Sequence, residues 1–487
     1  MTQTSVPSTG TRTSPFLQGA FAPVHTETTA HNLPVTGHLP PELDGLFTQI
    51  GPTPLRPPKH TTIDRYSWFT QDGLVSGVRI KDGKTAWFRN RWIRSRRVAR
   101  TLHEKAPPGP RHFPIDTVHT NLVPHNGLLL ALVETGCLPA RLNSNLDTVE
   151  YTDLAGRLPR GFSAHPKLDP VTGNLHVLAY SPLRTWAEYL VLAPDSSLAH
   201  RVRVPLGGRP MLHDIALSPR HVLFFDAPVR FTYSAAVRGA FPYRWQDTHQ
   251  TRIAVLPKPG VPGRLRWFDI PSGFVFHTIN AHEPDPQTIE LTGIRYDRLF
   301  DGADEDPLTG QGHLWKWTID LSTGRVADTQ MAERPHELPR SDSRRLGSDH
   351  RYYYAVSADS NHAIVSHQPD ALIKHDFATG RHQIRRLARG SAASEAVFVP
   401  HPEHSGEDTG WLLYFEHQTT AGTSTLVCLN AQDISGTPIA TVPLPLRVPL
   451  GAHSSWINSH DIPYTDAPPR AWPASPRVPQ QPDRPTD

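Results

Sequence analysis

One short element, Asp-x-x-Thr-Gly, occurs three times along the chain and constrains its fold more than any other feature. The copies are Asp169–Gly173, Asp320–Gly324 and Asp376–Gly380, and each lies between two short, strand-like runs. The aspartate side chain can bond to the backbone two residues ahead, and the glycine accepts a positive φ, so the element is typical of a β-hairpin turn. Its repetition predicts a chain of many antiparallel strands.

Other segments support an all-β chain. His119–Glu134 is predicted to be a hairpin, because two apolar runs flank an Asn126-Gly127 turn. Long amphipathic helical patterns are scarce, whereas strand-like segments recur in regular succession, which favours a sandwich, barrel or propeller. Further strands are expected at Arg252–Leu256, Arg264–Ile270, His313–Ile319, Tyr352–Val356 and Trp411–Glu416.

The length selects among these architectures. A sandwich does not need 487 residues, whereas a propeller blade takes about 40–50, so roughly 440 ordered residues would make six to eight blades. We predict an all-β, seven-bladed β-propeller over residues 21–463, with short helices and loops capping the active-site face. Residues 1–20 are expected to be a flexible lead-in and residues 464–487 a proline-rich, disordered tail.

Composition excludes several classes of function. The formal net charge is only +3 and no basic stripe is present, so nucleic acid is not an expected partner. No window is apolar enough to span a membrane, and the polar N-terminus is unlike a secretory signal. Cys137 and Cys428 are too few for a disulfide framework. We expect a cytoplasmic protein with no evident protein partner.

Four histidines, each at the end of a strand-like run, stand in distinctive local patterns. They are His165 in Gly161–Pro170, His213 in Met211–Asp214, His277 in Phe274–Glu283 and His453 in Val448–His453. The innermost strands of a propeller converge on its axis, so residues from four blades can meet there. Imidazole is a ligand for Fe, Cu, Zn and Ni, whereas a typical buried histidine bonds only to a backbone carbonyl. His176, His221 and His375 lack any such pattern and are interpreted as structural.

These contexts resemble the carotenoid cleavage oxygenases, the family that also contains stilbene-cleaving dioxygenases and retinoid isomerases. The resemblance covers about residues 21–460 and includes Leu33–Gly45, Gly51-Pro52, Trp68–Val75 and Asn90-Arg91, followed in order by the four histidine contexts. It implies an Fe(II) cofactor on the propeller axis, held by His165, His213, His277 and His453. His460 is the alternative to His453, because Ala452 and Ser454 depart from the family pattern around this position.

The resemblance also implies supporting residues. Glu134, Glu337 and Glu395 match the glutamates that accept hydrogen bonds from three of the four rings, without an assignment of glutamate to histidine. Thr120 matches a small residue that crowds one of the two vacant iron positions and leaves a single O2 site. His282 is expected to be a wall residue.

The implied reaction is cleavage of a carbon–carbon double bond with O2 to give two carbonyl products. Hydroxystilbene-cleaving relatives typically carry a lysine before the first supporting glutamate, and Val133 at this place favours an apolar conjugated substrate such as a carotenoid or apocarotenoid. Val229–Trp245, with Arg230 and Arg238, is expected either to line a tunnel mouth or to contact a membrane surface peripherally.

Four alternatives stay open. One is a hydroxystilbene- or phenylpropanoid-cleaving dioxygenase on the same site, and another is a non-oxidative isomerase built on the same iron. The other two keep the propeller but change the class: a calcium-dependent, lactonase-like hydrolase, which would need oxygen ligands on the axis, and a non-catalytic binding propeller.

Overall fold

The three Asp-x-x-Thr-Gly elements form the same turn in the computed structural model, which describes residues 14–58, 66–111, 116–134, 136–158, 161–237, 241–301, 310–358 and 368–463. In each copy the aspartate accepts a hydrogen bond from the backbone N–H two residues ahead. The glycine N–H donates a hydrogen bond to the aspartate backbone carbonyl and so closes the turn. The φ angles of the three glycines are +70°, +76° and +67°. The predicted hairpin turns are confirmed.

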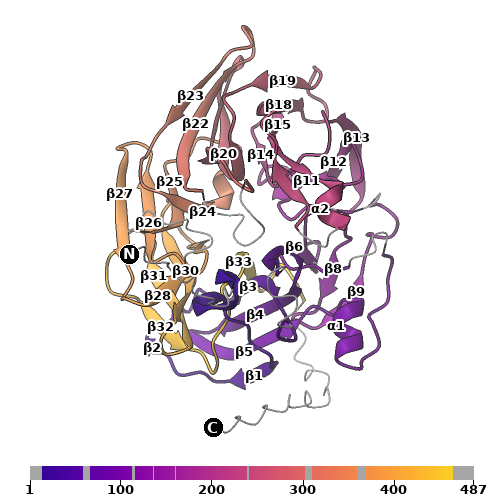
Figure 1. The fold of residues 1–487 in the computed structure, drawn as a ribbon. Coiled ribbons are helices and arrows are strands. Elements are labelled where there is room, and N and C mark those ends of the chain that lie inside the picture. Colours follow the sequence, from indigo (N-terminus) through magenta and orange to yellow (C-terminus); the bar gives the residue numbers. More distant parts are fainter. Residues whose placement is uncertain are drawn as a thin grey trace, which may run out of the picture.

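Seven sheets stand around a common centre, so the predicted seven-bladed propeller is confirmed (Figure 1). Each blade is an antiparallel sheet, whose strands follow one another from the axis outward. Blade 1 contains, in this order, β33 (His453–Asn458), β3 (Gly45–Thr53), β4 (Asp72–Lys81), β5 (Lys84–Trp92) and β1 (Thr28–His31); blade 2 contains β6 (Asn121–His125), β7 (Leu128–Leu132), β8 (Ala140–Leu142) and β9 (Thr148–Tyr151); blade 3 contains β10 (Lys167–Leu168), β11 (Leu175–Ala179), β12 (Trp186–Leu192) and β13 (Leu198–Pro205).

The remaining blades follow the same plan. Blade 4 contains β14 (Ile215–Leu217), β15 (His221–Asp226), β18 (Arg252–Pro257) and β19 (Arg266–Asp269); blade 5 contains β20 (Phe274–Asp285), β21 (Thr288–Tyr296), β22 (Gly312–Asp320) and β23 (Val326–Gln330); blade 6 contains β24 (His336–Ser341), β25 (Tyr352–Ser357), β26 (Ala371–Asp376) and β27 (Arg381–Arg386); blade 7 contains β28 (Ser391–Ala393) and β29 (Val397–Pro400), both paired to β30 (Gly410–Gln418), then β31 (Thr423–Asn430), β32 (Ala440–Pro443) and β2 (Thr36–Gly37).

Blade 1 closes the ring by joining the two ends of the chain. Strand β33 pairs with β3 in register from Gly45 opposite Asn458 to Ile50 opposite His453. In Figure 1 the yellow β33 lies beside the indigo β3 at the centre. Closure therefore carries His453 from the end of the sequence to the axis.

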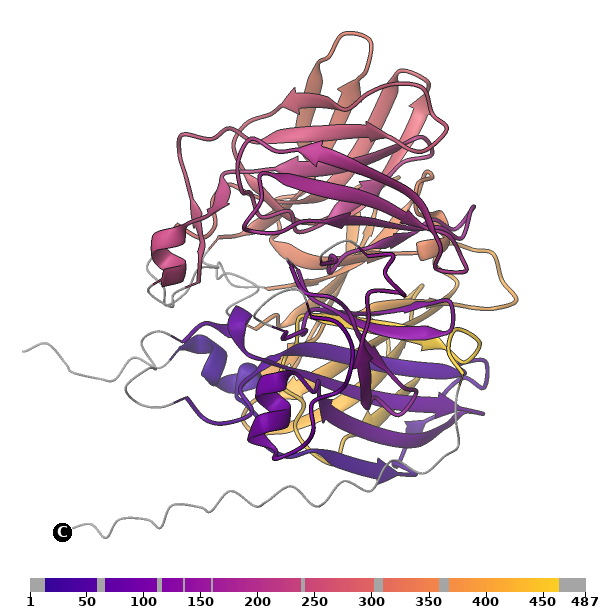
Figure 2. The same cartoon turned by 90° about the vertical axis from the view of Figure 1, so that its right-hand side faces the viewer.

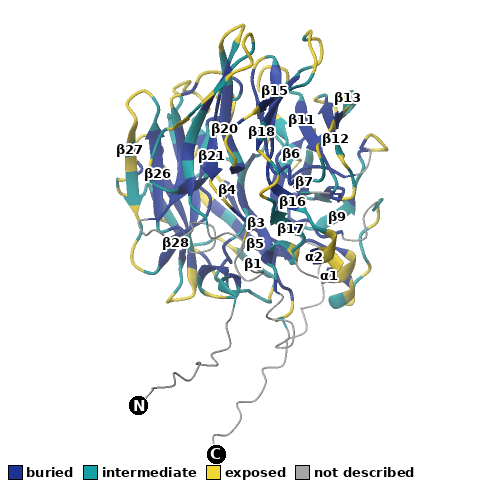
Figure 3. Cartoon of the chain, turned by 45° about the horizontal axis from the view of Figure 1, so that its top comes forward, coloured by how far each residue is buried: buried dark blue, intermediate teal, exposed yellow. Residues whose placement is uncertain are grey.

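The core lies between blades rather than in one central layer. All nine residues of β3 and all six of β15 are buried, as expected for strands covered on both faces. The rings of Phe47 and Phe415, 4.9 Å apart and edge-to-face, join blades 1 and 7. Figure 3 shows buried strands around the centre and exposed loops at the rim. This packing holds the innermost strands rigidly.

Short elements cover one end of the axis. They include the 3₁₀ turns η1 (Pro15–Leu17), η2 (Gly19–Phe21) and η4 (Trp68–Thr70), the pair β16 (Val229–Phe231) and β17 (Tyr243–Trp245), and the helix α2 (Tyr233–Val237). The helix α1 (Arg96–Thr101) and the turn η5 (Ser343–Arg345) are the other helical segments of the described chain. In Figure 2 both α-helices project from the same side of the propeller. The predicted capping helices and loops are present.

Part of the predicted lead-in belongs to this cap. Phe16 stacks on Trp68 with ring centroids 5.3 Å apart, and Phe21 meets the same indole edge-on at 5.5 Å. Because aromatic burial holds them, residues 14–20 are packed, in contrast to the expected flexibility. Residues 1–13 and the predicted tail, 464–487, lie outside the described residues.

Two further properties concern the chain as a whole. None of the described helices is long and apolar enough to cross a bilayer, and α1 has only six residues. Cys137 and Cys428 are both buried, and no disulfide joins them.

Candidate metal centre

The four histidines meet on the propeller axis. His165 and His213 lie just before β10 and β14, His277 lies within β20, and His453 begins β33. One ring nitrogen of each lies within 4.8 Å of the others, and all four residues are buried. Within the described chain, this is the one cluster of three or more histidine, cysteine or carboxylate side chains that could hold a metal ion. The structure thus brings together the whole predicted set.

Irregularities in strand pairing set the directions of the His277 and Glu337 side chains. The pairing of β20 with β21 shifts register between Val275 and Thr278, at His277, and that of β24 with β25 shifts between Glu337 and Arg340. A β-bulge re-aims side chains locally and is frequent beside functional sites. The bulges let His277 and Glu337 meet across blades 5 and 6.

Asp214 ties three of the histidine segments together. Its carboxylate accepts hydrogen bonds from the backbone N–H and the hydroxyl of Thr278, at 2.9 and 2.8 Å. Its other oxygen lies 2.8 Å from Lys167 Nζ. Burial opposes ionisation, but Lys167, His277 and the Thr278 backbone together lower the pKa of Asp214. Asp214 and Thr278 directly follow His213 and His277, and Lys167 lies shortly after His165. The interactions among them therefore fix the spacing of the strands that carry these histidines.

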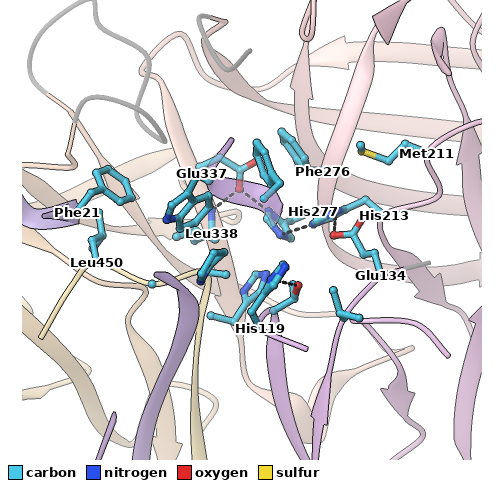
Figure 4. A pocket seen from close by; sticks show the side chains of 18 of the residues that line it. Phe21, His119, Glu134, Met211, His213, Phe276, His277, Glu337, Leu338 and Leu450 are labelled. Carbon is cyan, nitrogen blue, oxygen red and sulfur yellow. Dashed lines mark hydrogen bonds and ion pairs between the residues drawn. The ribbon is translucent and has the colours of Figure 1, made fainter. Parts of the chain in front are cut away.

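Three histidines have a glutamate behind the ring, and Figure 4 shows two of these pairs, His213 with Glu134 and His277 with Glu337. His213 Nδ1 lies 2.6 Å from Glu134 Oε1, and His277 Nδ1 lies 2.6 Å from Glu337 Oε2. His453 Nδ1 lies 3.2 Å from both oxygens of Glu395. Such contacts fix the tautomer and the ring plane. The structure thereby shows which glutamate contacts which histidine, an assignment that the sequence left open.

Arg340 anchors one of these glutamates. Its Nε and Nη2 donate to the two oxygens of Glu395 at 2.8 and 3.1 Å, and Nη2 also donates to the Ser454 carbonyl at 2.9 Å. Burial opposes the charge on Glu395, but Arg340 and His453 outweigh it and lower its pKa to about 2. Arg340 and Asp214 were not predicted as site residues from the sequence, because Arg340 has no recognisable local pattern and Asp214 was quoted only as part of the pattern around His213.

His165 differs from the other three. No carboxylate lies at ion-pair distance from its ring within the residues that the structure describes, and its buried Nε2 has no hydrogen-bond partner there. Burial, and then the neighbouring histidines, hold its pKa well below the usual value. A neutral imidazole with a free ring nitrogen is suited to donate to a cation.

The other rings also favour a bound cation. His213 Nε2 and His277 Nε2 face each other at 3.1 Å. Burial opposes a charge on His277, but Glu337, Asp214 and Glu395 together raise its pKa. Burial lowers the pKa of His453 to about 4 despite Glu395. The three glutamates and Arg340 carry a formal charge of −2, which a divalent cation balances. The donor set fits a transition metal.

A cavity of about 1090 Å³, including its open mouth, reaches the cluster. Three of the four histidines line it, namely His213, His277 and His453, together with Glu134 and Glu337 (Figure 4). Most of the remaining wall is apolar and comes from Phe21, Pro52, Trp68, Phe69, Val133, Met211, Phe241, Phe276, Phe300, Leu338, Val356, Pro369, Ala393, Leu450, Gly451 and Ala452. Such a cavity is suited to a long apolar ligand with few polar groups.

Thr120 lies in the cavity wall beside His119, a residue that was not predicted. Its hydroxyl lies 3.3 Å from Nδ1 of His119, which also lines the cavity. Burial lowers the pKa of His119 to about 4, so this ring is neutral near pH 7. The only sequence signal for it was its place next to Thr120.

The structure places the other histidines away from the cluster. His460 is 83% exposed next to Asp461, so it is not an alternative to His453. His282 lies 3.7 Å from Glu290 and does not line the described cavity, so its predicted wall position is wrong. His176, His221 and His375 contact Tyr189, Glu283 and His382 respectively.

Arg230 is a further correction. The segment that carries it was expected to line a tunnel mouth or to contact a membrane surface, but Arg230 is buried and its Nη2 donates to Asp226 Oδ1 at 2.7 Å. Arg252 also donates to Asp226, at 2.8 Å, so two arginines offset the cost of burying this carboxylate. Arg238 lies outside the described residues.

Fold and site together define a seven-bladed propeller whose axial histidine cluster opens into an apolar cavity. The chain belongs to the family described as retinal pigment epithelial membrane protein, which it matches over residues 21–458. Its relatives include the carotenoid cleavage oxygenases, which confirms the resemblance inferred from the sequence.

Individual relatives span nearly the whole chain. A carotenoid cleavage oxygenase of Mycobacterium tuberculosis is 34% identical, over 91% of this chain and 97% of the relative. A carotenoid 9,10(9',10')-cleavage dioxygenase of Arabidopsis thaliana is 29% identical, over 92% and 90%. The crystal structure of a Pseudomonas brassicacearum lignostilbene dioxygenase superposes with a TM-score of 0.82 at 27% identity, covering 94% of this chain and all of that one. These relatives support an oxygenase.

Proposed function

We propose that this chain is an Fe(II)-dependent dioxygenase that cleaves a carbon–carbon double bond of a carotenoid or apocarotenoid with O2, giving two carbonyl products. The observation that carries the proposal is the axial cluster of four buried histidines at the end of an apolar cavity. The named relatives, which include carotenoid-cleaving enzymes, supply the reaction class.

His165, His213, His277 and His453 would hold the iron, and bound ferrous iron would supply the activation of O2. Glu134, Glu337 and Glu395 hold three of the rings in one tautomer, so their free nitrogens point to one place. Thr120 occupies wall space beside the cluster, where it would restrict access to one open position.

The cavity wall would position the substrate. Its aromatic side chains, among them Trp68, Phe69 and Phe276, offer flat apolar surfaces to a conjugated chain and exclude water from the reacting bond. No general acid or base is required, because the reaction adds O2 and splits the adduct. The protein therefore contributes binding, orientation and a dry environment.

Val133 bears on the choice between substrates. It lines the cavity next to Glu134, where a lysine would meet a phenolic oxygen in the hydroxystilbene-cleaving relatives. An apolar side chain at this position favours the carotenoid proposal, whereas the superposition on a lignostilbene dioxygenase supports the hydroxystilbene alternative. Val133→Lys is expected to raise turnover of a hydroxystilbene relative to an apocarotenoid.

The decisive experiment combines metal analysis with product analysis. Purified protein is expected to contain about one iron per chain, and aerobic incubation with carotenoids, apocarotenals and hydroxystilbenes should give aldehyde or ketone fragments by mass. His213→Ala should lose both iron and turnover, whereas His460→Ala, at the exposed site, should retain both. Bound calcium would support a hydrolase, and geometric isomers without O2 uptake would support an isomerase.

We also propose peripheral contact with a membrane surface through α2, where an apolar substrate could enter. Val237 is 88% exposed and Tyr233 51%. The Tyr233 ring lies 5.1 Å from Phe231, which in turn lies 5.8 Å from the cavity-lining Tyr243. Val237→Glu is expected to reduce co-sedimentation with phosphatidylcholine vesicles, and unchanged co-sedimentation would contradict this contact.

A further inference from the structure

One hydroxyl in the cavity has no role in the metal centre. Among the described residues that line the cavity, Tyr243 is the only one whose sole polar side-chain atom is buried without a hydrogen-bond partner. The residue is 5% exposed and lies on β17, which Figure 3 shows between the blades and α2. Its ring is held between Phe231 and Phe241, each 5.8 Å away. The hydroxyl is therefore fixed in position.

The surroundings place this hydroxyl at the metal end of the cavity. It adjoins the Tyr180 hydroxyl and the Glu134 carboxylate, without a geometry that satisfies a hydrogen bond. Tyr180 donates instead to Glu134 Oε2 at 3.4 Å, and the other Glu134 oxygen lies 2.6 Å from His213. Figure 4 shows Glu134 beside His213. Tyr243 is therefore close to the place where the substrate would react.

An unpaired buried hydroxyl is costly. Leaving such a group unsatisfied costs about 1–3 kcal/mol, and phenylalanine would fill the same space without that cost. The remaining partners for Tyr243 are molecules that enter the cavity, either water or the substrate itself. The surrounding wall is apolar, which disfavours a persistent water with few polar partners.

The charges select the kind of partner. Burial raises the pKa of Tyr243, so its phenol stays protonated and can donate. The Glu134 carboxylate nearby disfavours a second negative charge in the same dry region. The partner is thus an uncharged oxygen, such as a carbonyl or a hydroxyl, rather than a carboxylate.

We propose that the Tyr243 hydroxyl binds an uncharged oxygen of the substrate, so the preferred substrate is an oxygenated conjugated molecule rather than a plain hydrocarbon. This inference rests on the proposed function, because it assigns the substrate class of the same cavity. An apocarotenal and a hydroxystilbene both carry such an oxygen, and the two sources are separated in the test.

The test compares Tyr243→Phe with Tyr66→Phe. Tyr66 is a matched control because it belongs to the same apolar cluster and has a buried, unpartnered hydroxyl, but it does not line the cavity. Iron-loaded proteins without O2 are titrated, by quenching of tryptophan fluorescence, with pairs of ligands that differ by one oxygen. The pairs are an apocarotenal with its methyl-terminated analogue, a ring-hydroxylated apocarotenal with its unhydroxylated form, and 4-hydroxystilbene with stilbene.

The wild-type protein is expected to bind the oxygenated member of at least one pair roughly tenfold more tightly, in line with one hydrogen bond in a dry site. Tyr243→Phe should remove that preference without weakening binding of the hydrocarbon, and Tyr66→Phe should keep it. The pair that responds identifies the source, apocarotenoid or stilbene. A carboxylic acid analogue should not bind more tightly than the aldehyde.

The inference is overturned if the wild type shows no preference within any pair, or if Tyr243→Phe retains it. Either result would leave a water molecule as the partner of the hydroxyl. Binding is read separately from cleavage, so the two proposals can fail independently. If the protein prefers the oxygenated ligand but forms no cleavage product, the dioxygenase proposal is refuted and the Tyr243 site stands. If the protein cleaves its substrate but Tyr243→Phe does not change the preference, the Tyr243 site is refuted and the dioxygenase proposal stands.

Discussion

Two groups of histidines lie in this propeller, a buried one on the axis and one in blade 6 whose His382 is half-buried, and only the first is built for a metal. In blade 6, His336 is held by the Arg334 carbonyl at 2.7 Å and the Tyr353 hydroxyl at 2.8 Å. His375 Nδ1 lies 3.2 Å from His382 Nδ1. None of these three rings has an ion pair with a carboxylate among the residues that the structure describes.

The difference shows that burial alone does not make a ligand. On the axis, three rings place Nδ1 against glutamates from other blades and leave a nitrogen free at a shared point. In blade 6, the rings contact a backbone carbonyl, a hydroxyl and one another, and no carboxylate of the described chain lies at ion-pair distance from them. A site for a divalent cation needs both converging lone pairs and balancing carboxylates.

The largest expected effect separates the two groups directly. His277→Ala should reduce the metal content from about one per chain to near zero and lower turnover by more than about 100-fold, a loss beyond that typical of supporting residues. His375→Ala should leave the metal content unchanged, because its ring lies in the blade 6 group. Elemental analysis and product yield measure both variants. Equal metal loss in both variants would contradict the distinction between the axial group and the blade 6 group.

The supporting carboxylates should have a smaller but clear effect. Glu337→Gln keeps the size of the side chain but removes the charge behind His277, so metal affinity should fall about 10- to 100-fold. Glu283→Gln is the matched control, since Glu283 contacts His221 at 3.0 Å outside the axial cluster. Competition with a chelator measures the affinities. Similar affinities for both variants would show that the glutamates serve the fold alone.

The smallest expected effect is on stability at acidic pH. Burial, and then His382, lower the pKa of His375 to about 4 from the ordinary 6.5. As the pH falls below 6.5, His375 is protonated in the unfolded chain, whereas in the folded chain it stays neutral until about pH 4. The free energy of unfolding therefore decreases over this interval. The contribution approaches 1.4 kcal/mol per pH unit for one group.

His375→Gln should therefore lose less stability than the wild type between pH 6.5 and 4, both measured free of metal by denaturant unfolding. The full contribution of His375 is present above pH 6.5, where the two proteins should show parallel behaviour. An identical slope in both proteins across the acidic interval would show that this histidine titrates normally in the fold.

The sequence by itself determined the architecture and the four histidines of the axial cluster. The Asp-x-x-Thr-Gly turns and the Asn126-Gly127 hairpin act through local hydrogen bonds and positive φ values, so they are readable without tertiary contacts. The expected strands lie in β18, β19, β22, β25 and β30. The four histidines were found from their local contexts and their order along the chain.

Only the tertiary structure decided how these parts serve one another. The pairing of Glu134 with His213, the clamp of Arg340 on Glu395, and the link from Asp214 to Lys167 and Thr278 all join residues from different blades. The packing of Phe16 on Trp68 is of the same kind. Their energies depend on distances between segments that are separated along the chain, and closure of the ring sets those distances.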